Sequence, residues 1–171
     1  MHNIKAKITG AISGTLLLAL MGCQQAHQYA PLTLTSLNQG QSRTLDISST
    51  GLWRDSAIGV RKGEVYRVAT QGAWSASPFC GETDASGLET EHLMCMKAIF
   101  ANAFPMPEAR IGALVGKIGV NGKPFVIGGT DGFIADRDGN LFLRMNDPDG
   151  LMFDNTGFIE VAVQRYSEGR A

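Results

Sequence analysis

The chain has 171 residues, with 15 Lys and Arg residues against 16 Asp and Glu residues. This length is sufficient for one domain with a substantial hydrophobic core. Without excess positive charge, the chain lacks the basic surface that nucleic-acid binding requires, so we exclude a nucleic-acid partner.

The first 22 residues have the pattern of a bacterial lipoprotein signal peptide. Lys5 and Lys7 precede an apolar run, residues 8–21, that is too short to span a membrane comfortably. The following Gly-Cys pair ends in Cys23, and the Leu-Met-Gly-Cys sequence resembles a lipobox, in which cleavage before the cysteine leaves it lipid-modified. The resemblance predicts several acyl chains on Cys23 and stable membrane anchoring. Because Gln24 follows in place of Asp, we expect the outer membrane, on its periplasmic or its outer surface. A plain signal peptide or a misassigned start is the alternative.

Cleavage would remove two Lys residues and no acidic residue, which leaves a mildly acidic chain of 13 basic against 16 acidic residues. We expect residues 23–42, rich in Gln, Thr and Ser, to form the lipidated N-terminus and a flexible tether. The domain is expected over residues 43–166, with a short tail at 167–171. If Cys23 carries lipid, Cys80 and Cys95 form an even pair, and an extracytoplasmic location favours a disulfide over two free thiols.

Short alternating segments bounded by turn residues predict an all-β fold. The expected strands lie around Leu45–Ile47, Ala57–Val60, Glu64–Gln71, Gly112–Val120, Pro124–Ile127, Phe133–Ala135, Leu141–Asn146 and Ile159–Val163. Residues 92–103 could form one short helix. We therefore predict a single antiparallel β-sandwich of the jelly-roll type, in which each sheet has one face exposed to solvent. Trp53 and Trp74 are expected to be core or rim aromatics, with sugar stacking as the alternative.

Two motifs resemble ligand loops but fail on spacing. The stretch from Gly112 to Lys117 is one residue short of a phosphate-binding loop, and Ile118 occupies the position of the magnesium-binding Ser or Thr. The run Asp136–Asn140 has its glycine at the fourth position where an EF-hand requires the sixth. We interpret the first as a strand and the second as a hairpin turn.

The loop between the last two predicted strands is rich in oxygen ligands. Its polar members are Asn146, Asp147, Asp149, Asp154 and Asn155. Three carboxylates within eight residues repel one another, and the loop contains neither Lys nor Arg. Ca²⁺ takes about six to eight oxygen ligands in a flexible geometry and would relieve this repulsion. The alternative is a solvated acidic turn, because Asp, Asn, Gly and Pro are the commonest turn residues.

Four stretches in the same order resemble the PA-IL/LecA-like family of calcium-dependent lectins. They are Gly-Val-x-x-Gly at 59–63, Gly-x-Trp at 72–74, Gly-Ala-Leu-Val-x-Lys-Ile-Gly at 112–119, and the acidic loop that ends in Asn-Thr-Gly at 155–157. The resemblance covers residues 45–163. It implies a galactose-binding-like β-sandwich that holds Ca²⁺ in its last loop, where the hydroxyls of a galactose-like sugar complete the coordination.

Carried over residue by residue, the resemblance implies the following ligands. The metal set is Asp147, Asp154, Asn155 and the backbone carbonyls of Leu151 and Ser77, and the sugar set is Asp147, Asp154, Asn155 and His92. Asp154 stands where the family has Asn, which adds a negative charge. Around His92 the Pro and Gln of the family are absent.

These observations predict a membrane-anchored, calcium-dependent carbohydrate-binding lipoprotein. Single shallow sugar sites bind weakly, so display of many copies on a membrane, or a homo-oligomer, would provide avidity. The alternative is a structural or protein-interaction lipoprotein that keeps the sandwich without a sugar site. We do not expect an enzyme, because His92 is the only His of the domain and carboxylates kept charged by a cation are poor general acids.

Overall fold

The computed structural model describes residues 35–90, 95 and 101–166. The predicted signal peptide, Cys23, the C-terminal tail and His92 lie outside these residues, so lipidation and the sugar contact of His92 stay predictions. Within the described part of the chain, no helix has the length and apolar character needed to cross a bilayer.

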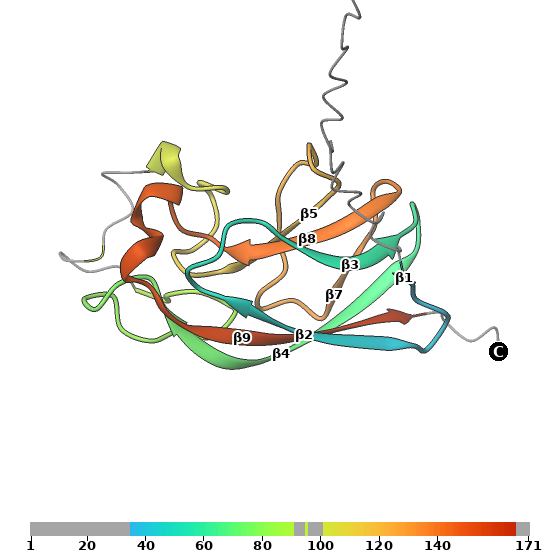
Figure 1. Ribbon diagram of the computed structural model, residues 1–171, viewed down its shortest axis with the longest axis horizontal. Helices are drawn as coiled ribbons and strands as arrows, with labels where there is room; N and C mark the ends of the chain where they lie inside the picture. The colour runs from blue at the N-terminus through green and yellow to red at the C-terminus, as the bar shows by residue number, and fades with distance from the viewer. Residues whose placement is uncertain (1–34, 91–94, 96–100, 167–171) are drawn as a thin grey trace, which may run out of the picture. The chain divides into compact units, whose positions relative to one another are not determined.

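Two β-sheets form the two layers of the domain (Figure 1). In spatial order, the first contains β1 (Thr35–Ser36), β3 (Arg54–Val60), β8 (Gly139–Met145), β5 (Leu114–Ile118) and β6 (Phe125–Val126), and the second contains β2 (Ser42–Ser48), β9 (Thr156–Tyr166), β4 (Val65–Ser75) and β7 (Gly132–Ile134). The described residues also contain the short 3₁₀-helices η2 (Ala101–Ala103) and η3 (Asp149–Asp154). All strand pairs are antiparallel except β1 with β3. The predicted all-β sandwich is confirmed.

Alternation places the core between the sheets. On β9, Ile159, Val161 and Val163 are completely buried, whereas Glu160 is exposed. Leu141 and Leu143 of β8 enter the same core. Burial of one such apolar side chain stabilises the fold by about 1.5–3 kcal/mol. Because successive side chains of a strand point to opposite faces, the face that carries these apolar residues is the one that packs into the core.

The domain begins earlier than residue 43. Thr35 and Ser36 pair with β3, and Leu37 is only 2 % exposed within the core. Part of the predicted tether is therefore a strand of the first sheet. Leu37 is a single apolar residue between polar neighbours, so no alternating pattern identified it.

The outer face of the first sheet is not wholly wet, because residues 101–110 are fastened to it. The Asn146 side chain accepts a hydrogen bond from the Met106 N–H (3.0 Å) and donates to the carbonyls of Met106, Ala109 and Arg110 (3.0, 3.3 and 3.0 Å). Arg144, on the same side of β8, is 1 % exposed. Asn146 thus holds a loop in place and does not take part in the acidic loop's ligand set.

Candidate functional site

A cavity of about 230 Å³ brings together residues that the sequence analysis selected. Its lining includes Ser77, Asp147, Leu151 and Asp154. Asn155 lies beside it and donates from Nδ2 to Asp147 Oδ2 at 3.0 Å. The five predicted metal ligands therefore occupy one region of the domain, at the end where η3 lies (Figure 1).

Strand pairing explains why these distant residues meet. Asp147 follows the end of β8, η3 turns the chain back, and Asn155 immediately precedes β9. The β4–β9 ladder ends with Ser75 paired to Thr156, which brings Ser77, two residues beyond β4, to the same end of the sheet as Asn155. Gly157 has φ 86°, and a Cβ there would lie 2.5 Å from the carbonyl oxygen of Ala73. The close strand approach that aligns the loop therefore requires glycine.

Asp147 is a buried carboxylate. It is 4 % exposed, and its burial raises the pKa of the carboxyl to about 6. The hydrogen bond from Asn155 and the charge of Arg144 act in the opposite direction, whereas the nearby charge of Asp154 raises the pKa further. In the absence of a cation, the ionised form of Asp147 is thus disfavoured relative to water.

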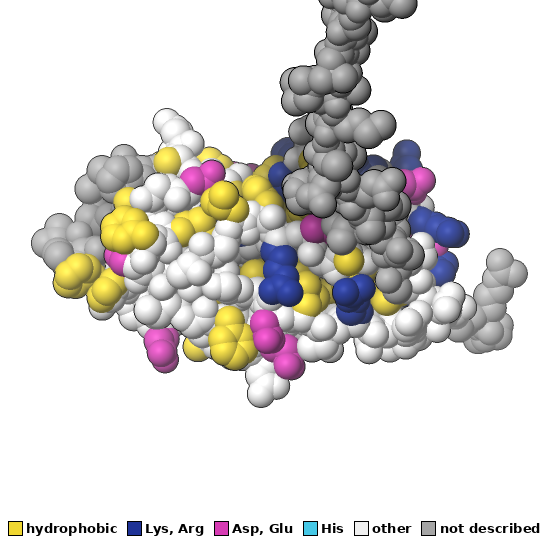
Figure 2. Space-filling model, viewed as in Figure 1, with side chains coloured by type: hydrophobic (Ala, Val, Ile, Leu, Met, Phe, Trp, Pro, Cys, Tyr) yellow, Lys and Arg dark blue, Asp and Glu magenta, His cyan; other side chains and the backbone are white. Residues whose placement is uncertain are grey.

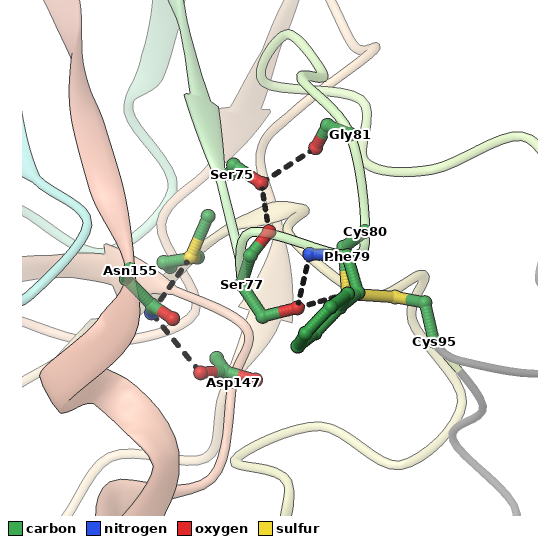
Figure 3. The surroundings of a disulfide bond; sticks show 9 residues. Ser75, Ser77, Phe79, Cys80, Gly81, Cys95, Asp147 and Asn155 are labelled. Carbon is green, nitrogen blue, oxygen red and sulfur yellow. Dashed lines mark hydrogen bonds between the residues drawn. A yellow bond between two sulfur atoms is a disulfide. The ribbon is translucent and has the colours of Figure 1, made fainter.

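Asn155 carries a buried oxygen without a hydrogen-bond partner. Its Nδ2 donates to the carbonyl of Ser49 and to Asp147 Oδ2, both at 3.0 Å. Because both partners are acceptors, the amide nitrogen must face them, which fixes the orientation of the amide. Asn155 Oδ1 then lies on the side that faces Ser77 (Figure 3) and makes no hydrogen bond within the described residues.

An unsatisfied buried oxygen costs about 1–3 kcal/mol, so a water molecule or a cation is expected to contact it. The hydroxyl of Ser49, the residue whose carbonyl Asn155 contacts, is a second buried group without a partner in the described part of the chain. The Asn155 oxygen, beside the cavity carboxylate of Asp147, is therefore the polar group for which a ligand is expected.

The Ser77 carbonyl belongs to a local turn. It accepts a hydrogen bond from the Cys80 N–H at 3.1 Å. The single hydroxyl proton of Ser75 can reach either this carbonyl at 2.6 Å or that of Gly81 at 2.7 Å, so a lone pair of the Ser77 oxygen is left whenever Ser75 donates to Gly81. The Ser77 hydroxyl contacts the Phe79 N–H and Cys80 Sγ (Figure 3). Ser77 thus builds the turn that shapes the cavity wall.

Asp149 is not part of the site, because Arg144 neutralises it. The guanidinium contacts Asp149 Oδ1 at 2.6 Å and also donates to the carbonyls of Asp147 and Met145. The loop itself contains neither Lys nor Arg, but a basic residue three positions before Asp147, in β8, relieves part of its charge. Asp147 and Asp154 remain as the two carboxylates of the cavity.

The predicted disulfide is confirmed and forms part of the cavity wall. Cys80 and Cys95 are bonded, with their Cα atoms 5.1 Å apart. Further apolar lining comes from Ala76, Phe104 and Ile111, and the exposed rings of Phe79 (61 %) and Phe153 (83 %) also contribute. Hydrophobic side chains are visible on the surface at this end of the domain (Figure 2). These walls were missed because isolated Phe residues in loops carry no periodic signal.

The site offers a small set of hard oxygen donors. Two carboxylates and one amide oxygen suit a cation such as Ca²⁺, which accepts carboxylate, amide, carbonyl and water ligands. Within the described residues, no group of three or more His, Cys, Asp or Glu side chains could hold a metal ion. The side-chain donors at this place are therefore two acids and the Asn155 oxygen, and a bound cation would need backbone carbonyls and water as its other ligands.

The two rejected motifs have ordinary structural roles. Lys117 lies within β5, and its Nζ donates to the carbonyl of Val120. In the second motif, Asp136 pairs with Arg137, and Asp138 accepts a hydrogen bond from the Lys62 N–H. The interpretation of the first as a strand is confirmed. The second is a turn but not a hairpin, because β7 and β8 on its two sides belong to different sheets, and Gly139 and Asn140 are already part of β8.

Comparison with known proteins shows similarity at the level of the fold. No protein-family model matches the chain, and no curated protein sequence does. A solved structure described as "EclA N-terminal domain; PllA-like lectin" is similar, with a TM-score of 0.54 and 16 % sequence identity over 71 % of this chain and 94 % of that one. The domain therefore has a lectin-like β-sandwich fold.

Proposed function

We propose that this protein is a calcium-dependent carbohydrate-binding lipoprotein. The observation that carries the proposal is the buried, unpartnered Oδ1 of Asn155 beside the buried carboxylate of Asp147. A buried carboxylate next to an unpartnered buried amide oxygen destabilises the fold unless a cation or a hydrogen-bonding ligand contacts them. The lectin-like fold of the domain supports the same class of function.

The residues of the cavity would have separate roles in binding the cation and the sugar. Asp147, Asp154 and Asn155 would hold the cation, and the backbone of η3 around Leu151 would line one side. Bound Ca²⁺ would supply coordination positions that two neighbouring sugar hydroxyls can occupy in place of water. Phe79 and Phe153 would contact the apolar face of the sugar or a substituent on it. The function is binding, with no catalytic step.

Isothermal titration of the purified protein with Ca²⁺, followed by glycan screening with and without the metal, tests the proposal. We expect saturable calcium binding and glycan binding that requires it, both lost in Asp147→Ala. Asp131→Ala, which changes an exposed Asp of the β6–β7 connection, is the matched control and should behave as wild type. No calcium binding at millimolar concentration, or unchanged glycan binding in Asp147→Ala, would contradict the proposal.

A structural or protein-interaction lipoprotein is the second candidate, and two observations favour it. The Ser77 carbonyl already accepts a hydrogen bond from the Cys80 N–H within its own turn, and the Asn155–Asp147 hydrogen bond by itself links the two ends of the loop. If calcium raises the melting temperature but no glycan binds, the result would favour a structural or protein-interaction role. A calcium-soaked crystal structure would then show how many ligands the ion has.

We further propose that the domain is tethered to the outer membrane through lipid on Cys23, which lies outside the described residues. The sequence pattern of residues 1–23 supports this. Metabolic labelling with a radioactive fatty acid should label the wild-type protein and leave Cys23→Ser unlabelled. Equal labelling of both would refute lipidation at this residue.

A further inference from the structure

A second crevice, of about 190 Å³, lies on the outer side of the first sheet. Its lining includes Trp53, Pro105, Lys117, Pro124 and Arg144. Lys117 of β5 and Arg144 of β8 lie on neighbouring strands, and Pro105 comes from the loop fastened by Asn146. The volume corresponds to about six water molecules, which is room for one small group of a ligand.

Two cations share one aromatic ring in this crevice. Lys117 Nζ lies 4.6 Å and the guanidinium carbon of Arg144 lies 5.6 Å from the centre of the Trp53 ring. Each cation is attracted to the ring, but the two repel each other. Burial and the charge of Arg144 lower the pKa of Lys117. The crevice therefore holds more positive charge than its aromatic ring balances.

The carboxylate in the lining of this crevice, that of Asp149, is paired with Arg144. Asp149 forms its ion pair with the Arg144 guanidinium, which also donates to two backbone carbonyls and to Met152 Sδ. Within the described residues Lys117 forms no ion pair. One Lys and one Arg against one Asp leave a local excess of one positive charge.

The groups that remain free are hydrogen-bond donors. Lys117 Nζ donates one of its three N–H bonds to the Val120 carbonyl at 2.7 Å, so two are left. The indole N–H of Trp53 makes no hydrogen bond in the described part of the chain. A concave surface with spare donors and excess positive charge suits a ligand that only accepts hydrogen bonds and is negatively charged.

We propose that this crevice is a second ligand site that binds an oxyanion, in the form of a carboxylate, sulfate or phosphate group, through Lys117 and Trp53. The oxyanion is either free or a substituent of an acidic saccharide. This site is separate from the cavity that contains Asp147. Experiments can therefore refute oxyanion binding here without refuting calcium and glycan binding at the cavity, and the reverse also holds.

The fluorescence of Trp53 provides the test. The purified protein contains two Trp residues, and Trp74 is 1 % exposed with its indole N–H bonded to the Gly112 carbonyl, so a surface ligand changes mainly the Trp53 emission. Sodium sulfate, methyl phosphate and glucuronate are titrated at constant ionic strength against sodium chloride, and galactose 6-sulfate is compared with free sulfate. Trp53→Phe should remove the signal.

We expect a saturable change with at least one oxyanion and at least a tenfold loss of affinity in Lys117→Met and Lys117→Gln. Lys62→Met, at an exposed lysine in the turn between β3 and β4, should keep the wild-type affinity. Equal affinity for free and saccharide-linked sulfate would identify the ion as the ligand, whereas tighter binding of the sugar sulfate would identify an acidic saccharide. A non-saturable response equal to that of chloride, or wild-type affinity in folded Lys117 variants, would overturn the proposal.

Discussion

Replacing Asp147 by Asn should stabilise the metal-free domain at neutral pH. A carboxyl whose pKa is raised from 3.8 to about 6 by folding costs at most about 3 kcal/mol at pH 7, and solvent at the cavity mouth reduces this to about 1–3 kcal/mol. The raised pKa means that the folded state holds a proton more tightly than the unfolded state. The stability contributed by neutral Asp147 is therefore complete below about pH 4 and is lost as pH rises through about 6. Asn keeps an acceptor for Asn155 Nδ2 and carries no charge.

The measurement is urea unfolding of wild type and Asp147→Asn in a calcium chelator from pH 4 to 8. The variant should match wild type near pH 4 and exceed it by about 1–3 kcal/mol above pH 7. With calcium at about one hundred times its Kd, wild type should gain about 2.7 kcal/mol, and the variant should gain far less. Asp131→Asn should follow wild type throughout. A variant that is less stable than wild type in chelator at pH 7 would refute the reasoning, because Asp147 would then be stabilising without a cation.

Three further changes test other parts of the structure. Cys80→Ser with Cys95→Ser should lower the free energy of unfolding by about 3 kcal/mol, the value for a loop of about 15 residues, and mass spectrometry of wild type should detect no free thiol at these positions. Asn146→Leu should cost at least about 3 kcal/mol, because several backbone groups of residues 106–110 lose their partner; equal unfolding midpoints would contradict this role. Phe153→Ser should weaken glycan binding several-fold with stability within about 0.5 kcal/mol, whereas Phe158→Ser, at another exposed Phe, should leave glycan binding unchanged.

The strands and the proximity of Asp147 to Asn155 could be predicted from sequence because both depend on local order. Ile159, Val161 and Val163 alternate with polar residues, and burial decides their face whatever the neighbouring strand is. Asp147 and Asn155 belong to a single loop between adjacent strands of the chain. Asp147 and Asn155 come close together if the loop brings the chain back from the end of one strand to the start of the next. The alternating patterns on both sides of the loop already indicated this.

Residues with distant partners could not be predicted in this way. Arg144 occupies a position of β8 that alternation assigns to solvent, yet it is buried against Trp53, Asp149 and the backbone of the acidic loop. Asn146 resembles a loop ligand by type, but its partners lie 36 to 40 residues away. Neither assignment follows from periodicity. The role of Asn146 depends on where residues 106–110 lie, and the burial of Arg144 depends on how the acidic loop and Trp53 pack against β8.

The core strands and the cavity of this domain differ in how well their residues are satisfied. The core strands agree with their pattern, their burial and their pairing, whereas the cavity contains a carboxylate with a raised pKa and an amide oxygen without a partner within the described residues. Such costs persist only where the surrounding structure enforces them. Here the enforcing contacts are the β4–β9 ladder on one side and Arg144, which holds the Asp147 carbonyl, on the other. Two rigid supports that hold a buried carboxylate at the cavity and an unpartnered amide oxygen beside it are the physical basis for expecting a ligand there.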